Sequence, residues 1–353
     1  MITARTLILG SAAGLIALSS GAQAADLPVK AKAVEYVRIC SLYGAGFFYI
    51  PGTDTCIKLG GYLRADVTFN GGAHGAPAWN GDLGQQNRYR DYFVARSRLA
   101  LTIDTRTATE YGVVRTFGQG DFQFNNVGGG TSNPTVLAAA PTSANLLSTA
   151  GGGYVAVEYL FIQFAGFTFG KSASAYATPW QGFPGNLNSS LLGGQNTDTG
   201  VNQIQYTAQF GNGVSASIGA DDPTVWERTS LYNLALGVSA SGTGTNAYGG
   251  THAPDIVGNI RVDQAWGLLQ LSAAAHEVVP SYNILGAGGV PTALSEISGH
   301  PDTKWGGAVM GALQIKNIPT GAGDDIKLDV SYAKGATKYV IATSGASPNF
   351  AMF

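Results

Sequence analysis

Charged residues are scarce in this chain of 353 residues: Asp, Glu, Lys and Arg make up 12 % of it, and the net charge is only −2. A soluble globular domain usually carries about 25 % charged residues. No basic excess is present, so a nucleic-acid partner has no electrostatic support. The scarcity of charge therefore excludes a typical nucleic-acid-binding protein and fits an ordinary soluble domain poorly.

Residues typical of reactive sites are also few, with two cysteines, three methionines and four histidines. His74, His252, His276 and His300 are far apart in the sequence, and none stands at metal-ligand spacing from cysteines or carboxylates. No nucleophile elbow, phosphate-binding glycine loop or calcium loop occurs. We therefore expect no enzyme activity, no metal and no cofactor, and interpret the histidines as loop or rim residues.

Long apolar runs are missing after residue 24, which excludes a transmembrane helix there. Residues 1–24 resemble a secretory signal peptide, with Arg5 in the positive region, the apolar stretch TLILGSAAGLIAL, and the small-residue cleavage site Ala22-Gln23-Ala24. A membrane-anchoring helix is the weaker alternative, because the apolar stretch is short and a cleavage site follows it. The sequence thus predicts an exported protein whose mature chain begins at Ala25.

Glycine and tyrosine are abundant instead, with 50 and 16 residues, which favours β-structure with many turns. After Cys56, apolar residues such as Leu59 and Leu63 alternate with polar ones such as Lys58 and Arg64, which predicts a strand with two different faces. Similar patterns predict eleven strands, at about 57–69, 90–104, 110–118, 154–164, 167–171, 201–210, 214–219, 255–263, 267–277, 303–315 and 324–334. A twelfth is expected at TKYVIAT, residues 337–343.

The links between these strands alternate between long and short. They span residues 70–89, 105–109, 119–153, 165–166, 172–200, 211–213, 220–254, 265–266 and 278–302, with a medium link at 316–323. Such alternation is typical of outer-membrane barrels, whose two rims carry short periplasmic turns and longer outer loops. Strands of ~9–11 residues are long enough to cross a bilayer when tilted. We therefore predict an all-β fold, a transmembrane antiparallel up-and-down β-barrel.

The candidate functional residues are arginines in strand positions. Arginine facing lipid near the midplane costs about 2–4 kcal/mol, so in a barrel these side chains are expected to line the lumen rather than a solvated surface. We predict a pore lining that consists of Arg64, Arg96, Arg98, Arg115, Asp66 and Asp104. The link at residues 172–200 carries Asp198 as its only charge. We interpret it as a loop folded inward to narrow the pore, the alternative being a surface loop.

The only two cysteines, Cys40 and Cys56, stand just before the first predicted strand. In an oxidising compartment such a pair is expected to form a disulfide rather than two free thiols. It would enclose the fifteen residues Ser41–Thr55 and stabilise the fold by about 3 kcal/mol in the chain-entropy picture. We therefore interpret residues 25–55 as a cross-linked periplasmic segment and residues 56–353 as the barrel.

The segment EYVRICSLYGAGFFYIPGTDTCIKLGGYLRADV closely resembles the N-terminal signature of alphaproteobacterial porins of the Rhizobiales type. TEYGVVRTF (Thr109–Phe117) and FIQFAGFTFGKSASAY (Phe161–Tyr176) are similar to later blocks of that family. The resemblance implies a sixteen-stranded outer-membrane barrel, usually a homotrimer, whose link after the fifth strand constricts the pore. The ending TSGASPNFAMF lacks the alternating aromatics of a closing strand, which suggests a chain truncated at its C-terminus.

The sequence thus predicts an outer-membrane porin that passes small hydrophilic solutes and ions by passive diffusion, in contact with membrane lipid and lipopolysaccharide. An exported soluble β-sandwich or adhesin that binds glycans through loop aromatics is the alternative. An outer-membrane barrel enzyme would need a Ser/His/Asp-type constellation, which the sequence does not contain.

Overall fold

The structure is a computed structural model that describes residues 38–69, 93–125, 154–180, 200–224, 231–232, 248–281, 301–340 and 351–352. In this part of the chain the helices are two single 3₁₀ turns, η1 (Ser41–Tyr43) and η7 (Thr337–Tyr339). Neither is long and apolar enough to cross a membrane. The rest of the ordered structure is β-sheet.

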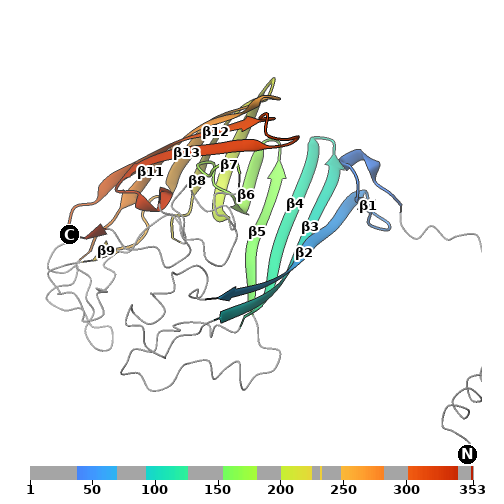
Figure 1. Cartoon of the computed structure of the whole chain (residues 1–353), viewed down its shortest axis with the longest axis horizontal. Coiled ribbons are helices and arrows are strands. Elements are labelled where there is room, and N and C mark those ends of the chain that lie inside the picture. Colours follow the sequence, from blue (N-terminus) through green and yellow to red (C-terminus); the bar gives the residue numbers. More distant parts are fainter. Residues whose placement is uncertain are drawn as a thin grey trace, which may run out of the picture. The chain divides into compact units, whose positions relative to one another are not determined.

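Twelve strands form one curved antiparallel sheet whose spatial order follows the chain order (Figure 1). They are β1 (Phe48–Tyr49), β2 (Thr55–Phe69), β3 (Phe93–Thr109), β4 (Gly112–Asn125), β5 (Tyr154–Phe164), β6 (Phe167–Ser172), β7 (Val201–Gly211), β8 (Val214–Asp221), β10 (Asp255–Asp263), β11 (Gly267–Val278), β12 (Lys304–Lys316) and β13 (Asp325–Lys334). Two short strands, β9 (Leu231–Tyr232) and β14 (Ala351–Met352), pair in parallel with each other. All eleven strands predicted from the sequence are present, in the predicted up-and-down order.

The structure departs from the predicted strands most clearly at three places. β3 continues through residues 105–109, predicted as a link, because its threonines are β-branched and pair with β4. β4 continues to Asn125, where the sequence predicts a loop from residue 119. The expected twelfth strand is wrong over Thr337–Tyr339: this stretch forms η7, and Tyr339 is buried against the sheet instead of extending it.

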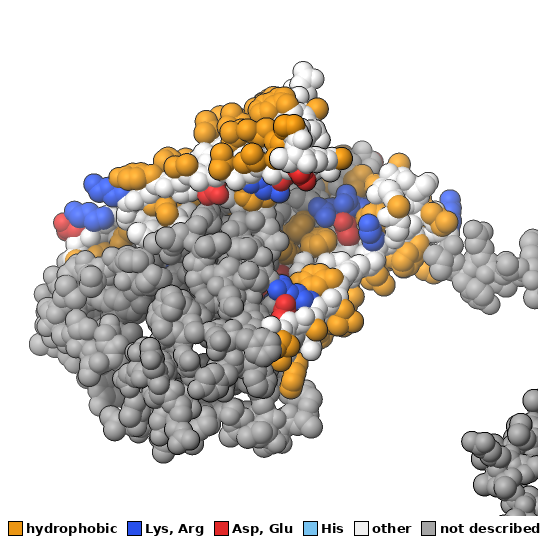
Figure 2. Space-filling model, in the orientation of Figure 1, with side chains coloured by type: hydrophobic (Ala, Val, Ile, Leu, Met, Phe, Trp, Pro, Cys, Tyr) orange, Lys and Arg blue, Asp and Glu red, His pale blue; other side chains and the backbone are white. Residues whose placement is uncertain are grey.

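The two faces of the sheet have opposite character. Large apolar side chains on one face, the outer face, are exposed: Leu63 is 79 % exposed, Val330 77 % and Tyr332 67 %. Figure 2 shows hydrophobic side chains along the outer outline of the sheet, with basic and acidic side chains gathered toward its hollow side. The alternation read from the sequence therefore separates an apolar surface from a polar one.

Short turns connect the strands at one rim of the sheet. Ala165 and Gly166, between β5 and β6, have φ of 50° and 86°, and Asn212 and Gly213, between β7 and β8, have 49° and 71°. Positive φ at both central residues is the mark of the type I′ turn, whose twist matches that of the paired strands. These turns set the register of their hairpins.

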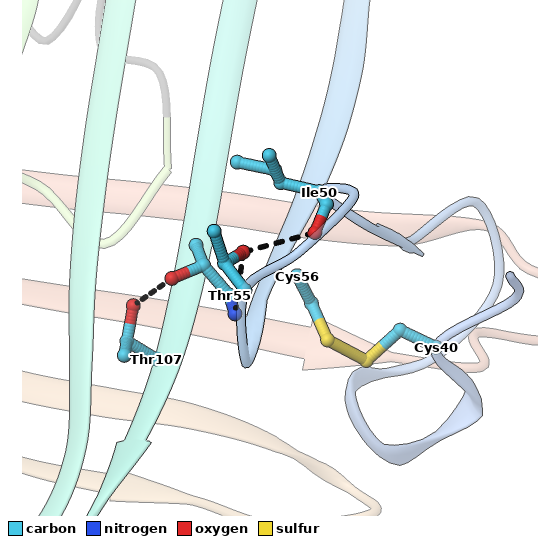
Figure 3. Close-up of a disulfide and its surroundings, with 6 residues drawn as sticks. Cys40, Ile50, Thr55, Cys56 and Thr107 are labelled. Atoms are coloured by element: carbon cyan, nitrogen blue, oxygen red, sulfur yellow. Dashed lines mark hydrogen bonds between the residues drawn. A yellow bond between two sulfur atoms is a disulfide. The ribbon is translucent and has the colours of Figure 1, made fainter. Parts of the chain in front are cut away.

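The predicted disulfide joins Cys40 to Cys56 with the two Cα atoms 6.1 Å apart (Figure 3). Both cysteines are buried in a small cluster with Phe47. Next to it, the Thr55 and Thr107 hydroxyls hydrogen-bond across β2 and β3 at 2.9 Å. The sheet also begins earlier than predicted, because β1 lies within the pre-strand segment and pairs with β2.

Candidate functional site

The hollow side of the sheet, here termed the inner face, holds a stretch of chain that follows β6. Residues 173–180, here termed the anchored segment, accept hydrogen bonds at alternate carbonyls from three amide side chains of the sheet. Gln203 Nε2 of β7 donates to the Ala173 carbonyl at 2.6 Å, Asn259 Nδ2 of β10 to Ala175 at 2.6 Å, and Gln270 Nε2 of β11 to Ala177 at 2.7 Å. The segment is not a strand, since the Ala177 N–H donates to the Ser174 carbonyl at 3.0 Å in a turn, and the three amide side chains hold this turn against the wall.

Packing reinforces these bonds. The inner face of β11 and β12 presents small side chains, Ala274, Ala308 and Ala312, which leave room for Tyr176 of the anchored segment. The centroid of the Tyr176 ring lies 4.6 Å from the centroid of the Tyr339 ring, and the two rings meet edge to face. Burial raises the pKa of Tyr176 to about 12, so the phenol is neutral at physiological pH. The first residues of the link predicted to fold inward therefore do pack on the inner face.

The inner face of β2–β4 carries a different chemistry, a row of arginines. Arg64 of β2 lies directly across from Arg98 of β3, and its Nε donates to Asp66 Oδ1 at 2.7 Å. Arg98 donates to Gln123 Oε1 at 2.9 Å through Nη2, and its Nη1 lies 3.0 Å from Asp121 Oδ2. Arg64 is thus paired with Asp66 and Arg98 with Asp121. These carboxylates offset the repulsion between the two neighbouring arginines.

Asp104 lies at the centre of a second group, nearer the short-turn rim. Arg106 Nε donates to Asp104 Oδ1 at 2.8 Å, and Arg115 Nη2 donates to Asp104 Oδ2 at 2.9 Å. Arg115 also donates to Gln163 Oε1 at 2.9 Å, and its guanidinium lies 5.2 Å from the Phe117 ring centroid. Two guanidiniums share one carboxylate, so the group has a net positive charge.

The structure thus brings five of the predicted site residues to one face, and they are Arg64, Asp66, Arg98, Asp104 and Arg115. Arg96 occupies a position in β3 opposite Asp66, but its side chain lies outside the described residues. Asp198 lies outside them entirely, as does most of the predicted inward loop.

Sequence reasoning missed Arg106 and Asp121, which bind the predicted residues directly. Both were placed in links because β3 and β4 were predicted to end too early. The signal was available: Arg106 continues the even-numbered polar positions of β3, and Asp121 the odd-numbered ones of β4. Extending the alternation by a few residues would have included both.

His276 was predicted to be a loop or rim residue, and the structure places it in a strand, near the end of β11. It is buried, and its Nδ1 is 2.8 Å from Asp255 Oδ1 of β10. The Tyr339 hydroxyl donates to Asp255 Oδ2 at 2.7 Å, and the Tyr248 hydroxyl lies 3.4 Å from His276 Nε2. These contacts join residues that are far apart in the sequence, which is why spacing could not reveal them. The network fastens η7 and the stretch before β10 to the sheet.

No cluster of three or more metal-binding side chains occurs among the residues that the structure describes.

Comparison with known proteins decides the family. The family model described as the Porin subfamily matches residues 26–351, nearly the whole chain. The chain belongs to this family. Porin Omp2b of Brucella suis is 32 % identical over 285 residues, which cover 79 % of this chain and 68 % of that protein. Porin Omp2b of Brucella abortus (strain 2308) is 32 % identical over 293 residues, which cover 79 % and 67 %.

A solved structure supports the fold. The outer membrane channel DcaP of Acinetobacter baumannii matches with a TM-score of 0.52 and 15 % identity, over 84 % of this chain and 68 % of that one. The resemblance read from the N-terminal signature is confirmed, as is the all-β porin fold. As a porin, the chain is a channel protein of the outer membrane rather than an enzyme.

Proposed function

We propose that this porin forms a water-filled channel through which small hydrophilic solutes and ions diffuse passively. The observation that carries the proposal is the two-sided sheet. Its outer face exposes apolar side chains in every long strand, whereas its inner face carries arginines, carboxylates and amides. Backbone groups in hydrocarbon must pair internally, so a sheet with an apolar exterior and a polar interior suits a membrane channel.

The alternative, a soluble sandwich or adhesin, fits this surface poorly. Contiguous apolar patches larger than a few hundred Å² are rare on soluble monomers. Here exposed Leu, Ile, Val and Phe recur from β2 to β13, including Leu59, Leu160, Ile204, Ile260 and Leu328. Such a surface favours lipid as its surroundings.

Within the channel, we assign the row Arg64, Arg98 and Arg115, with Asp66 and Asp104, to the pore lining. Arg96 and Asp198 join it as predictions from the sequence. The anchored segment supports the proposal that residues 172–200 fold inward and narrow the pore. Charges facing a narrow aqueous path would sort solutes by sign and diameter.

The assembly and export of the chain are further parts of the proposal. Residues 1–24 would direct Sec-type export as a signal peptide, and residues 25–55 would lie in the periplasm. The resemblance to Rhizobiales-type porins favours a homotrimer in contact with lipid and lipopolysaccharide.

Single-channel recording in planar bilayers tests the proposal. The full chain, refolded in detergent, is expected to insert in discrete steps of ion-conducting current. A protein that stays water-soluble and monomeric without detergent, and that gives no conducting steps, would favour the adhesin alternative. A lipid-hydrolysis assay on the same preparation tests for the barrel enzyme.

A further inference from the structure

A cavity of about 510 Å³ lies between the anchored segment and the inner face of β7, β8, β10 and β11. Its lining runs from Ala173 and Pro179 on the segment to Gly213 and Asp263 at the short-turn rim. The cavity therefore lies on the short-turn side of the anchored segment. Its volume falls within the range of about 300–1,000 Å³ found for small-molecule sites.

The wall of this cavity consists mainly of neutral hydrogen-bonding side chains. Gln205 Nε2 donates to Thr207 Oγ1 at 3.0 Å, and the Thr207 and Ser217 hydroxyls are 2.9 Å apart. Gln205 Oε1 is buried and accepts no hydrogen bond from the residues that the structure describes. A buried acceptor without a partner costs free energy, so this oxygen favours a ligand that brings a hydroxyl donor. Gln209 and Ser215 extend the same chemistry.

One end of the cavity is charged. Arg261 Nη2 lies 3.1 Å from Asp263 Oδ2, and Lys316 Nζ lies 2.8 Å from Asp263 Oδ1. Two cations share one carboxylate, so this end has a net charge of one positive unit. Arg261 is a lining residue, and its planar guanidinium can bind a second carboxylate through two parallel hydrogen bonds.

We propose that this cavity binds a polyhydroxylated carboxylate, that is, a sugar acid. The hydroxyl groups of the solute would bond the amide and hydroxyl side chains of β7 and β8, and its carboxylate would bond Arg261. A neutral sugar would form the hydrogen bonds to the wall but would leave Arg261 without a carboxylate. A simple carboxylate would bind Arg261 but would form no hydrogen bonds to the wall. The proposal rests on the channel function, since the solute reaches the cavity through the lumen.

The test measures block of the single-channel potassium chloride current by D-glucuronate, with D-glucose and acetate as comparison solutes. Glucuronate is expected to reduce the current in a saturable manner, with a dissociation constant on the order of millimolar. Glucose is expected to bind about tenfold or more weakly, and acetate to give no saturable block, because each lacks one half of the contacts.

Three variants assign the effect to the cavity. Arg261→Gln should weaken the glucuronate block by about tenfold or more, whereas Arg261→Lys, which keeps the charge but loses the paired hydrogen bonds, should weaken it less. Gln205→Leu should weaken the block by glucuronate and glucose alike. Arg38→Gln, which removes an arginine outside the cavity, is the matched control and should leave the block unchanged.

Several outcomes would overturn the proposal. Equal block by glucose and glucuronate would make the site one for neutral sugars, and equal block by acetate would make it a bare anion site. A block that Arg261→Gln leaves unchanged would place binding elsewhere. A conducting channel without saturable block refutes the sugar-acid site alone, while the absence of conducting steps refutes the channel itself.

Discussion

At the scale of single residues, Asp104 governs the charge of the β3–β4 wall. It is the shared partner of Arg106 and Arg115, and together the three leave one positive charge on the inner face. Fixed charges of this kind act on passing ions through the local potential, which salt screens over about 10 Å at 0.1 M. Changing this one carboxylate therefore changes the field while every arginine keeps its charge.

Asp104→Asn is expected to shift the permeability ratio of the channel toward anions. The substitution removes the carboxylate that neutralises one of two guanidiniums, so the net charge of the group rises by one unit. The zero-current potential in a potassium chloride gradient measures the shift. Asp302→Asn, at an exposed aspartate of the long link before β12, removes the same charge away from the wall and should change this potential far less. An equal shift in both variants would contradict the assignment.

Prediction from sequence worked at this scale where a residue's role followed from its own strand. Arg64, Arg98 and Arg115 share a face because period-two alternation places them there. The pairing of Asp255 with His276 was out of reach, because it depends on the register between β10 and β11. Likewise, the amides that hold the anchored segment come from three strands, and nothing in their spacing marks them as a set.

At the scale of elements, the register of β2 on β3 depends on a close backbone approach at Gly61. This residue has φ of 141°, and a Cβ added there would lie 1.9 Å from the Ala100 carbonyl oxygen of β3. A side chain can be accommodated only if the two strands separate locally. The position therefore requires glycine.

Gly61→Ala is expected to destabilise the folded protein by about 1–3 kcal/mol, the usual cost of forcing a residue into a sparsely populated backbone conformation. Urea unfolding in lipid vesicles, followed by tryptophan fluorescence, measures the change. Gly120→Ala in β4 is the matched control, because a Cβ there meets no atom within 4 Å. Equal stability of the two variants would show that the strands separate without cost.

The anchored segment gives a second prediction at this scale. Replacing Gln203, Asn259 and Gln270 together by alanine removes hydrogen bonds worth about 0.5–1.5 kcal/mol each, so the segment should leave the wall more often. Single-channel recordings should then show a noisier open state with altered mean conductance. Gln119→Ala removes an inner-face amide that donates to Asp121 rather than to the anchored segment, and it should leave the noise unchanged. If the triple variant showed no increase in current noise, packing of Tyr176 alone would be sufficient to hold the segment.

The strands themselves were the most predictable elements, since eleven two-faced segments can be read directly from alternation. The positions at which the strands end were less predictable. Thr105 and Thr107 extend β3 with polar side chains on its outer face near the rim, where apolar periodicity no longer gives a signal. η7 replaces a predicted strand because Tyr339 is held by Asp255, a contact that no local pattern encodes.

At the scale of the whole molecule, the two faces of the sheet require two different surroundings. Leu101→Arg places a charge on the outer face near the middle of β3, and it is expected to destabilise the protein in a bilayer by about 2–4 kcal/mol. Thr102→Arg, one residue further, places the same charge on the inner face and should cost much less. Urea unfolding in vesicles compares the two. Similar losses of stability would contradict the assignment of lipid and water to the two faces.

The chain-order arrangement of the sheet also has a consequence for how the protein is assembled. Every strand of the large sheet pairs with strands adjacent to it in the chain order of that sheet. The loop-closure entropy of each pairing is then set by a single connection, and for the hairpins closed by Ala165-Gly166 and Asn212-Gly213 it is minimal. Hairpins can therefore form first and join edge to edge. The rate of folding would then be limited by the long connections, the longest of which in the large sheet, residues 222–254, joins β8 to β10.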